Sequence, residues 1–469
     1  MKKILATALL TSVLSLTIMP ALAINSKNAD EIYYNPAQKR GHFSRKKTDE
    51  QMNEYKFAYI NYDWWNIFED DYLNAYIRQA IENNHQLKAS TLATQEYYQA
   101  MKMQFSQELP QVMGGIAPAY VKMPGTTHSA WSYAVPLFAS YEADIFLKNH
   151  DKTKSAKKSY EASLQDERSA YISIASAVGT TYLNIVKLDK IIAIQQEITD
   201  MRSKLYELEK LRYEEGISSS MDVVQTEKGF ILAQDSLIEL KKAHYQLLTQ
   251  FAVLIGESPE NIDTLTRKSF DELGYLKEIP TEISTETIIN RPDYIKAEKL
   301  VEKAGLDVRV AKKEFLPTFA VGGVALFNNS ELAHLFTTKG ALTAIGLNAI
   351  GSLFTGGRKV ANLKMKKAQY KRILENYYQT NLTAVQEVNN SLFVLKSDDE
   401  RYQQLLGQYK DEMNSYELNE ERYKEGVLSE YDLMRYRESL LTLEKQIDSY
   451  KINSLVNLIG LYKATASDM

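Results

Sequence analysis

The sequence predicts a mainly α-helical fold with a small β part, built from two copies of one unit. Proline is absent from Leu137 to Ser258 and from Thr318 to the C-terminus, and apolar residues recur every three or four positions in the helical blocks of both stretches, as long helices require. The stretch "RYEEGISSSMD" at Arg212 to Asp222 returns as "RYKEGVLSEYD" at Arg422 to Asp432. This return indicates an internal two-fold repeat.

The first 23 residues have the layout of a secretory signal peptide. Lys2 and Lys3 precede an apolar run that ends at Ile18, and the small-residue site Ala21-Leu22-Ala23 follows. We expect cleavage after Ala23, which places the mature protein outside the cytoplasm. Residues 24–69 are then expected to form an N-terminal periplasmic segment.

The composition excludes several other classes of protein. The chain has no cysteine, so it forms no disulfide, and no lipid anchor on a cysteine is expected. Its formal net charge of −4 is spread along the chain, which argues against a nucleic-acid partner. After the leader, no apolar run approaches the roughly 18 to 20 residues of a membrane-spanning helix. Any contact with a membrane must then be made by strands in a closed barrel.

Helical periodicity predicts long helices at about 155–215, 220–255, 358–425 and 430–463, with shorter helices near 70–107 and 285–314. A helix of some 60 residues extends about 90 Å. Because helices in globular proteins average about a dozen residues, this length indicates a long coiled-coil assembly. The apolar positions cover more than one narrow seam, so each helix is expected to contact neighbours on two sides.

Two regions between the helical blocks show strand periodicity. One is a hairpin at about 111–141, with "QVMGGIAPAYVK" joined to "AWSYAVPLFASY" through "MPGTTHS". The other is a hairpin at about 317–355, with "PTFAVGGVALF" and "GALTAIGLNAIGSLF". Small and aromatic residues with few charges suit strands that face lipid. The smallest barrels of this type need about eight strands, so two or three subunits must share one barrel.

Each half of the chain therefore follows one plan: helix, hairpin, long helix, tip turn, helix. The first repeat is predicted at 70–279 with its tip turn at 214–220, and the second at 280–469 with its tip turn at 424–430. Gly216 and Gly426 suit the left-handed conformation that ends a helix. Ser219 with Asp222, and Ser429 with Asp432, have the spacing of a capping box that starts the next helix.

The chain resembles the TolC-like outer-membrane factors of bacteria. The resemblance is carried by the repeated "RYxxG(I/V)xSxxD", by "RPDYIKAE", by "FLP" before a strand and by "LFTGGR" at Leu353 to Arg358. The segment "YDWWNIFEDDYLNAYIRQAIENN" and "YEADIF" at Tyr141 to Phe146 are similar to the members that serve resistance-nodulation-division pumps.

This resemblance implies a homotrimer in the bacterial outer membrane. Four strands per subunit would form one 12-stranded β-barrel in contact with outer-membrane lipid, and the helices would continue it as a long α-helical periplasmic barrel. The trimer would be the passive exit duct of a tripartite efflux system that exports small toxic compounds. Its partners would be a periplasmic adaptor (membrane fusion) protein and an inner-membrane pump of the resistance-nodulation-division type.

The resemblance also assigns roles at the tips. Residues that would meet the adaptor are Gly216, Ile217, Ser218, Gly426, Val427, Leu428 and Ser429. Asp222 and Asp432 match acidic positions of the periplasmic aperture, whereas a second aperture acid of some members falls at Arg435 here. Three Asp432 carboxylates on a symmetry axis would repel one another and attract cations.

Other sequence features are explained by packing. The six histidines show no metal-ligand spacing, and no phosphate loop, zinc motif or nucleophile elbow is present. No enzyme activity, cofactor or metal is therefore predicted. Thioethers suit copper(I), but flexible packing near the strands is the favoured role of Met101, Met103, Met113 and Met123. Trp64-Trp65 is expected to anchor the N-terminal segment against the helices.

Two alternative functions remain open. One is the outer-membrane duct of a type I protein secretion system, against which the Trp64-Trp65 segment argues. The other is a purely structural periplasmic coiled coil, which the paired strand regions disfavour.

Overall fold

The computed structural model describes residues 64–122, 129–274, 283, 285–337, 341–352 and 354–466. The predicted signal peptide, residues 24–63 of the N-terminal segment and Leu353 of the "LFTGGR" landmark lie outside the described residues. The described chain forms two compact units. Unit 1 contains residues 98–157 and 302–370, and unit 2 contains residues 64–97, 158–301 and 371–466.

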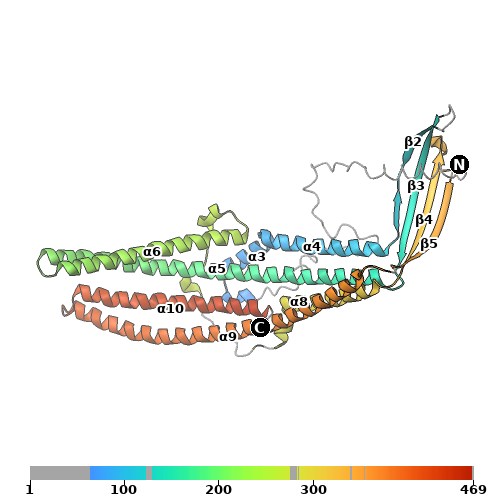
Figure 1. Cartoon of the computed structure of the whole chain (residues 1–469). Helices are drawn as coiled ribbons and strands as arrows, with labels where there is room; N and C mark the ends of the chain where they lie inside the picture. Colours follow the sequence, from blue (N-terminus) through green and yellow to red (C-terminus); the bar gives the residue numbers. More distant parts are fainter. Residues whose placement is uncertain are drawn as a thin grey trace. The chain divides into compact units, whose positions relative to one another are not determined.

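Long helices dominate the fold (Figure 1). The two longest are α5 (Lys148–Glu214) and α9 (Arg358–Lys424), each of 67 residues. Each is followed by a helix of 36 residues, α6 (Ser220–Ile255) and α10 (Glu430–Thr465). The four predicted long helices are thus confirmed. Helix α5 begins about seven residues earlier than predicted, because the Asp144 carboxylate accepts hydrogen bonds from the backbone N–H groups of Lys148 (2.6 Å) and His150 (2.8 Å).

The two shorter helices were predicted as continuous, which is wrong. The first is divided into α3 (Asp71–Asn83) and α4 (His85–Phe105). At the break, the Asn84 side chain accepts from the Leu87 N–H (3.0 Å) and donates to the Leu254 carbonyl (2.9 Å). The second is divided into α7 (Thr285–Ile289) and α8 (Pro292–Lys313). Pro292 is tolerated as the first residue of a helix but not within one.

Short 3-10 helices complete the helical elements. They are η3 (Trp64–Phe68), η4 (Ser106–Glu108), η5 (Pro259–Thr264), η6 (Phe270–Glu272) and η7 (Leu332–His334).

Unit 1 contains one antiparallel sheet in the order β1–β3–β4–β5, with β2 also paired to β3. The strands are β1 (Gln111–Gly114), β2 (Ala117–Lys122), β3 (Ser129–Ala143), β4 (Thr318–Asn329) and β5 (Ala341–Ile350). Both predicted hairpins are confirmed, since β2 pairs with β3 and β4 with β5. The sheet also pairs β3 with β4, so strands from the two halves of the chain lie side by side.

The interruption between β1 and β2 has a local cause in Pro136. Gly114 lies opposite Leu137 and Ala117 lies opposite Ala134, so the break faces Val135 and Pro136. The Pro136 carbonyl accepts from the Gly115 N–H at 3.2 Å, so the hydrogen-bonding side of Pro136 faces the β1–β2 edge. Proline has no N–H to return, so the ladder loses a hydrogen bond at that point.

The core of unit 2 lies where α3, α5, α6 and α10 pack. Its fully buried side chains include Leu73, Ile77, Tyr182, Leu183, Phe251, Ile255 and Ile452. Trp65 is 2% exposed and Phe68 is 7% exposed, so the predicted anchoring of the N-terminal segment is confirmed for Trp65. Buried Asp70 caps α3 and also accepts a 2.7 Å hydrogen bond from the Tyr182 hydroxyl, which holds the segment against α5.

The "RPD" landmark forms a buried ionic link in unit 2. Arg291 binds Asp293 (2.7 Å) and Glu387 (2.6 Å) and also donates to the Ala464 carbonyl. Burial alone would lower the pKa of Arg291, but its two carboxylate partners raise it. The guanidinium therefore stays charged and ties the start of α8 to α9 and the end of α10.

A second buried charge cluster in unit 2 surrounds Asp448 of α10. Lys190 of α5 contacts Asp271 (3.4 Å) and Glu444 (3.5 Å), and Lys451, Tyr402 and Tyr409 face the same place. Burial raises the pKa of Asp448 to about 6, and the charges of Glu444 and Asp271 add to the rise while those of Lys190 and Lys451 oppose it. One Asp448 carboxylate oxygen has no hydrogen-bond partner.

Asp448→Asn should stabilise the protein most at neutral pH. Because the pKa of Asp448 is higher in the folded chain than its ordinary value, the charged form opposes folding. The stability contributed by the neutral acid is present below about pH 4 and is lost as pH rises through about 6. We expect a gain of about 1 to 2 kcal/mol at pH 7.5, allowing for partial screening, and almost none at pH 4.

Thermal unfolding of both forms across this pH range measures the difference. Asp235→Asn, at an exposed position of α6, is the matched control. A stability difference that does not change with pH would contradict the assignment.

Candidate functional site at the two helix reversals

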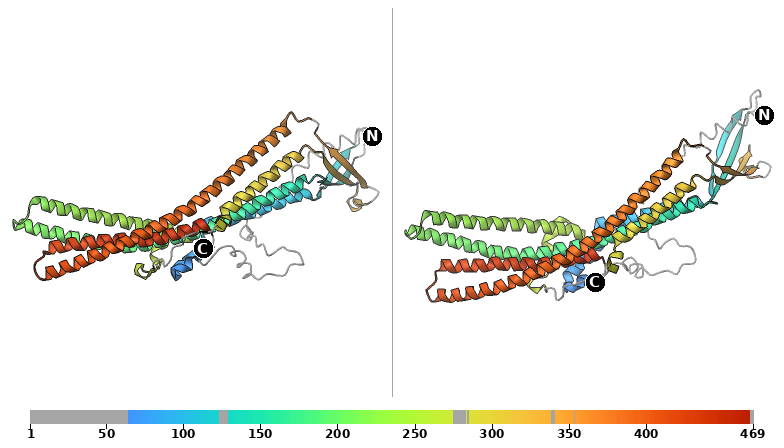
Figure 2. Two further views of the ribbon diagram at one scale, coloured as in Figure 1. Left: turned by 90° about the horizontal axis from the view of Figure 1, so that it is seen from below. Right: turned by 60° about the horizontal axis from the view of Figure 1, so that its bottom comes forward.

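Both reversals lie in unit 2 and at the same end of their helical hairpins (Figures 1 and 2). The first joins α5 to α6, and the second joins α9 to α10. The guanidinium carbon of Arg212, in the last turn of α5, lies 5.8 Å from the centre of the Tyr431 ring in the first turn of α10. The two tips are therefore neighbours.

Each long helix ends in the same glycine motif. Gly216 has φ of +70° and Gly426 has φ of +75°. The Gly216 N–H donates to the Tyr213 carbonyl (3.0 Å) and the next N–H, of Ile217, donates to the Arg212 carbonyl (2.8 Å). The second tip repeats both bonds at 2.9 Å. This is the Schellman arrangement, in which a left-handed residue satisfies the last carbonyls of a helix.

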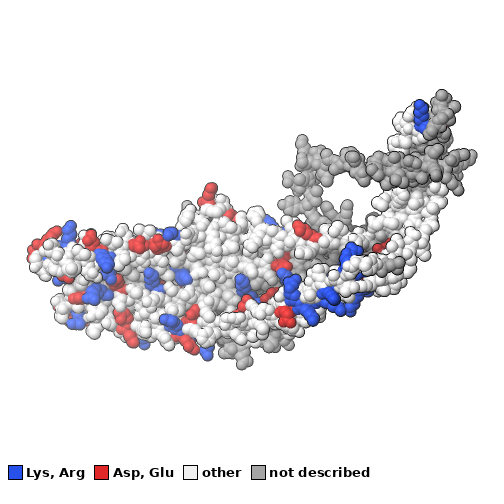
Figure 3. All heavy atoms as spheres, in the orientation of Figure 1, with Lys and Arg blue, Asp and Glu red and all other residues white. Residues whose placement is uncertain are grey.

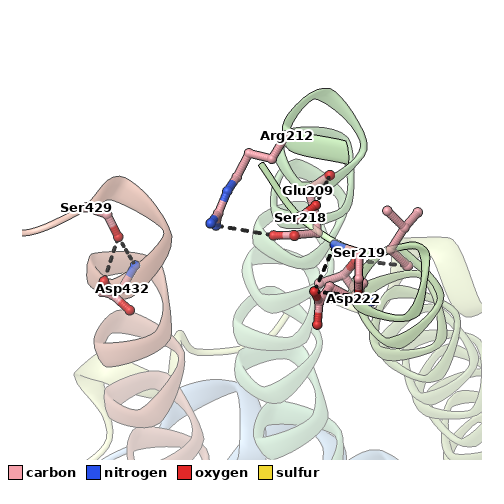
Figure 4. A network of polar contacts seen from close by, with 9 residues as sticks. Glu209, Arg212, Ser218, Ser219, Asp222, Ser429 and Asp432 are labelled. Atoms are coloured by element: carbon pink, nitrogen blue, oxygen red, sulfur yellow. Dashed lines mark hydrogen bonds and ion pairs between the residues drawn. The ribbon is translucent and has the colours of Figure 1, made fainter. Parts of the chain in front are cut away.

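Each following helix starts at the predicted serine cap, but the predicted capping box is complete only at the first tip (Figure 4). The Asp222 N–H donates to Ser219 Oγ at 3.3 Å, and the Asp222 carboxylate accepts from the Ser219 backbone N–H at 3.1 Å, which completes a capping box. At the second tip the Asp432 N–H donates to Ser429 Oγ at 3.1 Å, and Ser429 Oγ donates to the Asp432 carboxylate at 2.6 Å.

The two acids differ in exposure and in surroundings. Asp222 is exposed, and hydrogen bonds from Ser219 followed by the charge of Arg212 lower its pKa. Asp432 is half-buried. The structure places them on separate helices, and each is bonded to the serine of its own turn.

The predicted contact residues form an exposed rim at each tip. Gly216 and Ile217 are exposed, Ser218 is half-buried, and the second tip repeats this pattern in Gly426, Val427 and Leu428, with Ser429 exposed as well. The Ile217 side chain is 68% exposed and that of Val427 is 65% exposed. Exposed apolar side chains at the end of a hairpin suit contact with another protein.

Two buried residues that were not predicted, one at each tip, contact the arginines of the motif. Glu209 is 3% exposed and lies 3.4 Å from Arg212, while Asn419 is 6% exposed and accepts from Arg422 at 3.3 Å. Both precede their arginine by three residues. The signal was present, because "YEL" precedes the motif in both copies, at 206–208 and 416–418.

Ion pairs between α5 and α10 were also missed. Arg202 binds Glu438 at 2.7 Å, and Arg437 binds Glu197 at 2.9 Å. Their partners lie more than 200 positions apart, so no local pattern in the sequence indicates them. These ion pairs join the first hairpin to the second behind the tips.

No metal site accompanies this arrangement in the part of the chain that the structure describes. There, no group of three or more His, Cys, Asp or Glu side chains is placed to hold a metal ion. The helices of the same part also include none that is both long and apolar enough to cross a bilayer.

Known proteins are similar to this chain in sequence or in fold. The probable efflux pump outer membrane protein TtgC of Pseudomonas putida is 24% identical over 409 residues, which cover 86% of this chain and 84% of TtgC. The cation efflux system protein CusC of Escherichia coli is 22% identical over 414 residues, covering 87% of this chain and 89% of CusC. The CmeC outer membrane channel of Campylobacter jejuni superposes with a TM-score of 0.78 at 23% identity, covering 87% of this chain and 88% of CmeC.

Long helical hairpins joined to a small antiparallel sheet are thus a fold that this chain shares with a solved outer membrane channel. Residues 76–257 and 283–467 match the outer membrane efflux protein family. The chain belongs to this family.

Replacing the tip glycines with alanine should loosen the reversals. At Gly216 or Gly426 a side chain meets no neighbour within 4 Å, so the cost is that of the left-handed backbone alone, about 1 kcal/mol. We expect roughly fivefold faster hydrogen exchange at the end of α5 in Gly216→Ala and at the end of α9 in Gly426→Ala, measured by mass spectrometry.

Gly407→Ala is the control, because Gly407 is an exposed residue inside α9 with open space around it. Alanine favours a helix interior, so this variant should slow exchange in α9. Equal changes in hydrogen exchange in the Gly407 and Gly426 variants would rule out the left-handed backbone as the cause.

Proposed function

We propose that this outer-membrane efflux protein is the exit channel through which a tripartite system passes small toxic compounds out of the cell envelope. The observation that carries the proposal is the joining, in one family-matched chain, of two long helical hairpins with a sheet rich in exposed apolar residues. The channel performs no chemistry: it supplies a path, and its partners supply energy and selection.

The working unit is a homotrimer whose subunits share one 12-stranded barrel in contact with outer-membrane lipid. Among the described strands, β5 pairs only with β4, and β1 and β2 pair only with β3. Open edges of this kind leave backbone groups unpaired, and no lipid can satisfy them. Pairing the β5 edge of each copy with the β1 and β2 edge of the next removes every edge. In β5, Ile345 is 86% exposed and Leu347 is 72% exposed, as lipid-facing strands require.

The helices of the three copies form the long periplasmic barrel beneath. Large apolar side chains on α6 and α9 are exposed in the single chain, among them Ile231, Leu232, Leu382 and Phe393. A water-soluble surface rarely presents so long an apolar stripe, so neighbouring copies cover it.

The chain arose as two repeats, at 70–279 and 280–469. The equal lengths of α5 and α9, and of α6 and α10, support this division, as does the glycine end that both reversals share. The family match also falls into two segments, which begin at 76 and 283.

The tips receive the periplasmic adaptor protein, which links the channel to an inner-membrane pump of the resistance-nodulation-division type. The contact residues are Gly216, Ile217 and Ser218 with Gly426, Val427, Leu428 and Ser429. Exposed Ile217 and Val427 supply apolar contact area, and the glycines allow close approach of another backbone.

Asp222 and Asp432 line the periplasmic aperture. Three-fold symmetry brings three copies of each carboxylate around one axis, where like charges repel and cations are attracted. Half-buried Asp432 is the stronger candidate, because burial increases the effect of each charge.

Deletion of the gene should make the bacterium more sensitive to a panel of dyes, detergents and antibiotics, because the exit from the envelope is lost. Export of a large protein is measured in the same cells. Restoring the gene should restore resistance. Unchanged sensitivity together with loss of protein export would support a type I secretion duct instead.

Asp432→Ala should change single-channel conductance or the block by divalent cations in a planar bilayer, because it removes three carboxylates from the aperture. Ser429→Ala is the matched variant: it removes the cap of α10 but keeps the charge. If the Asp432 variant conducts like the wild type, or if both variants change conductance equally, Asp432 has a capping role only.

A further inference from the structure

A cationic cavity lies in unit 1 where the sheet meets the helices. Strand β3 ends at Ala143 just before α5, β4 begins at Thr318 just after α8, and β5 ends at Ile350 shortly before α9. A cavity of about 480 Å³ opens among these connections. Its lining includes Lys148, Glu314, Leu316, Thr318, Arg358 and Lys359.

The cavity carries a net positive charge, because the Glu314 carboxylate offsets only one of its two cations Arg358 and Lys359. Lys148 is paired with Glu142 at 2.8 Å, and Glu314 accepts a hydrogen bond from Asn362 at 3.0 Å. Arg358 and Lys359 have no ion-pair partner in the described part of the chain. A net positive charge beside a cavity attracts an anionic ligand.

The positive charge continues along the adjoining helices (Figure 3). From Arg358 to Tyr370, α9 carries five cations and no acid. We call these five, Arg358, Lys359, Lys364, Lys366 and Lys367, the basic collar. None of them is ion-paired within the described ranges, in contrast to Arg309 and Lys313 of α8, which both bind Asp151.

Exposed apolar side chains border the collar on the sheet side. Phe146 follows β3, Phe315 and Leu316 precede β4, and Phe354 follows β5. Phe354 is 89% exposed and Phe315 is 47% exposed. Aromatic side chains followed by cations are the pattern of a bilayer interface, where rings lie at the edge of the hydrocarbon and cations reach the headgroups.

We propose that the basic collar binds the anionic headgroups of phospholipids in the periplasmic leaflet, with one phosphate held in the cavity by Arg358 and Lys359. The proposal rests on the outer-membrane placement given above. An anionic glycan strand would bind the cations but would leave the apolar border uncovered. The acyl chains of a phospholipid cover that border while its phosphate reaches the cavity.

The distance of each cation from the headgroup layer determines how strongly it contributes to lipid binding. The headgroup layer is only about 5 to 8 Å thick on each side of a bilayer. Arg358 and Lys359 lie in the first turn of α9, while Lys364, Lys366 and Lys367 follow about 9 to 14 Å further along the helix. That distance exceeds the screening length of about 8 Å, so the first two cations dominate.

The test uses the full chain purified in mild detergent, stripped of lipid and then offered phosphatidylglycerol or phosphatidylethanolamine. Native mass spectrometry measures how much of each lipid is retained. The wild type should prefer phosphatidylglycerol. R358Q together with K359Q should reduce that preference by up to about 30-fold, since each cation near an anionic surface contributes roughly fivefold in affinity.

K228Q together with K241Q is the matched control, because it removes two exposed lysines of α6 that form no ion pair among the described residues and so changes the net charge equally. It should leave the preference intact, and R358K, which keeps the charge, should retain most of it. Equal retention of both lipids by the wild type overturns the proposal. So does an equal loss in the control variant, or displacement of phosphatidylglycerol by anionic peptidoglycan fragments.

Conductance in a bilayer of neutral lipid separates this proposal from the proposed function. The R358Q and K359Q variant should still conduct there, because its strands and helices are unaltered. A wild type that retains phosphatidylglycerol but never conducts would contradict the channel and leave the lipid site standing.

Discussion

The structure depends on covering very long helices along their whole length. A helix of 67 residues cannot rely on intrinsic propensity, because most helical stability in proteins comes from packing of the apolar face. Helix α5 meets this need within its own chain, where Tyr171, Tyr182, Ile194 and Leu205 are buried. Helix α9 buries far fewer apolar side chains in the described chain and exposes others such as Leu382 and Phe393. In the proposed trimer, neighbouring copies complete what α9 lacks.

Tight reversals make such coverage possible. A long loop between α5 and α6 would let the two helices slide, whereas a Schellman end followed directly by a serine cap fixes where one helix stops and the next one starts. The same device at α9 and α10 gives both hairpins a matching end. Buried Glu209 and Asn419 then hold Arg212 and Arg422 in place, and the ring of Tyr431 joins one tip to the other.

Charge is distributed to match three different surroundings. The sheet carries few charges, the first turns of α9 carry only cations, and the tips carry more acids than cations. In the proposed setting these regions meet lipid, headgroups and a protein partner, in that order. Buried charges elsewhere have a structural role: Arg291 links α8, α9 and α10, and the Asp448 cluster lies where α5, α9 and α10 meet.

The sequence by itself determined the four long helices, the two strand pairs and the caps at Ser219 and Ser429, because proline, glycine, periodicity and capping residues act on the backbone locally. It also identified the tips, since a repeated motif records a repeated local structure. Only the tertiary structure decided the contact of Asn84 with Leu254, the pairing of β3 with β4 and the Arg202–Glu438 and Arg437–Glu197 ion pairs. Each of these joins residues more than 150 positions apart. A local pattern holds no information about which distant atoms will meet, so those contacts are fixed by packing alone.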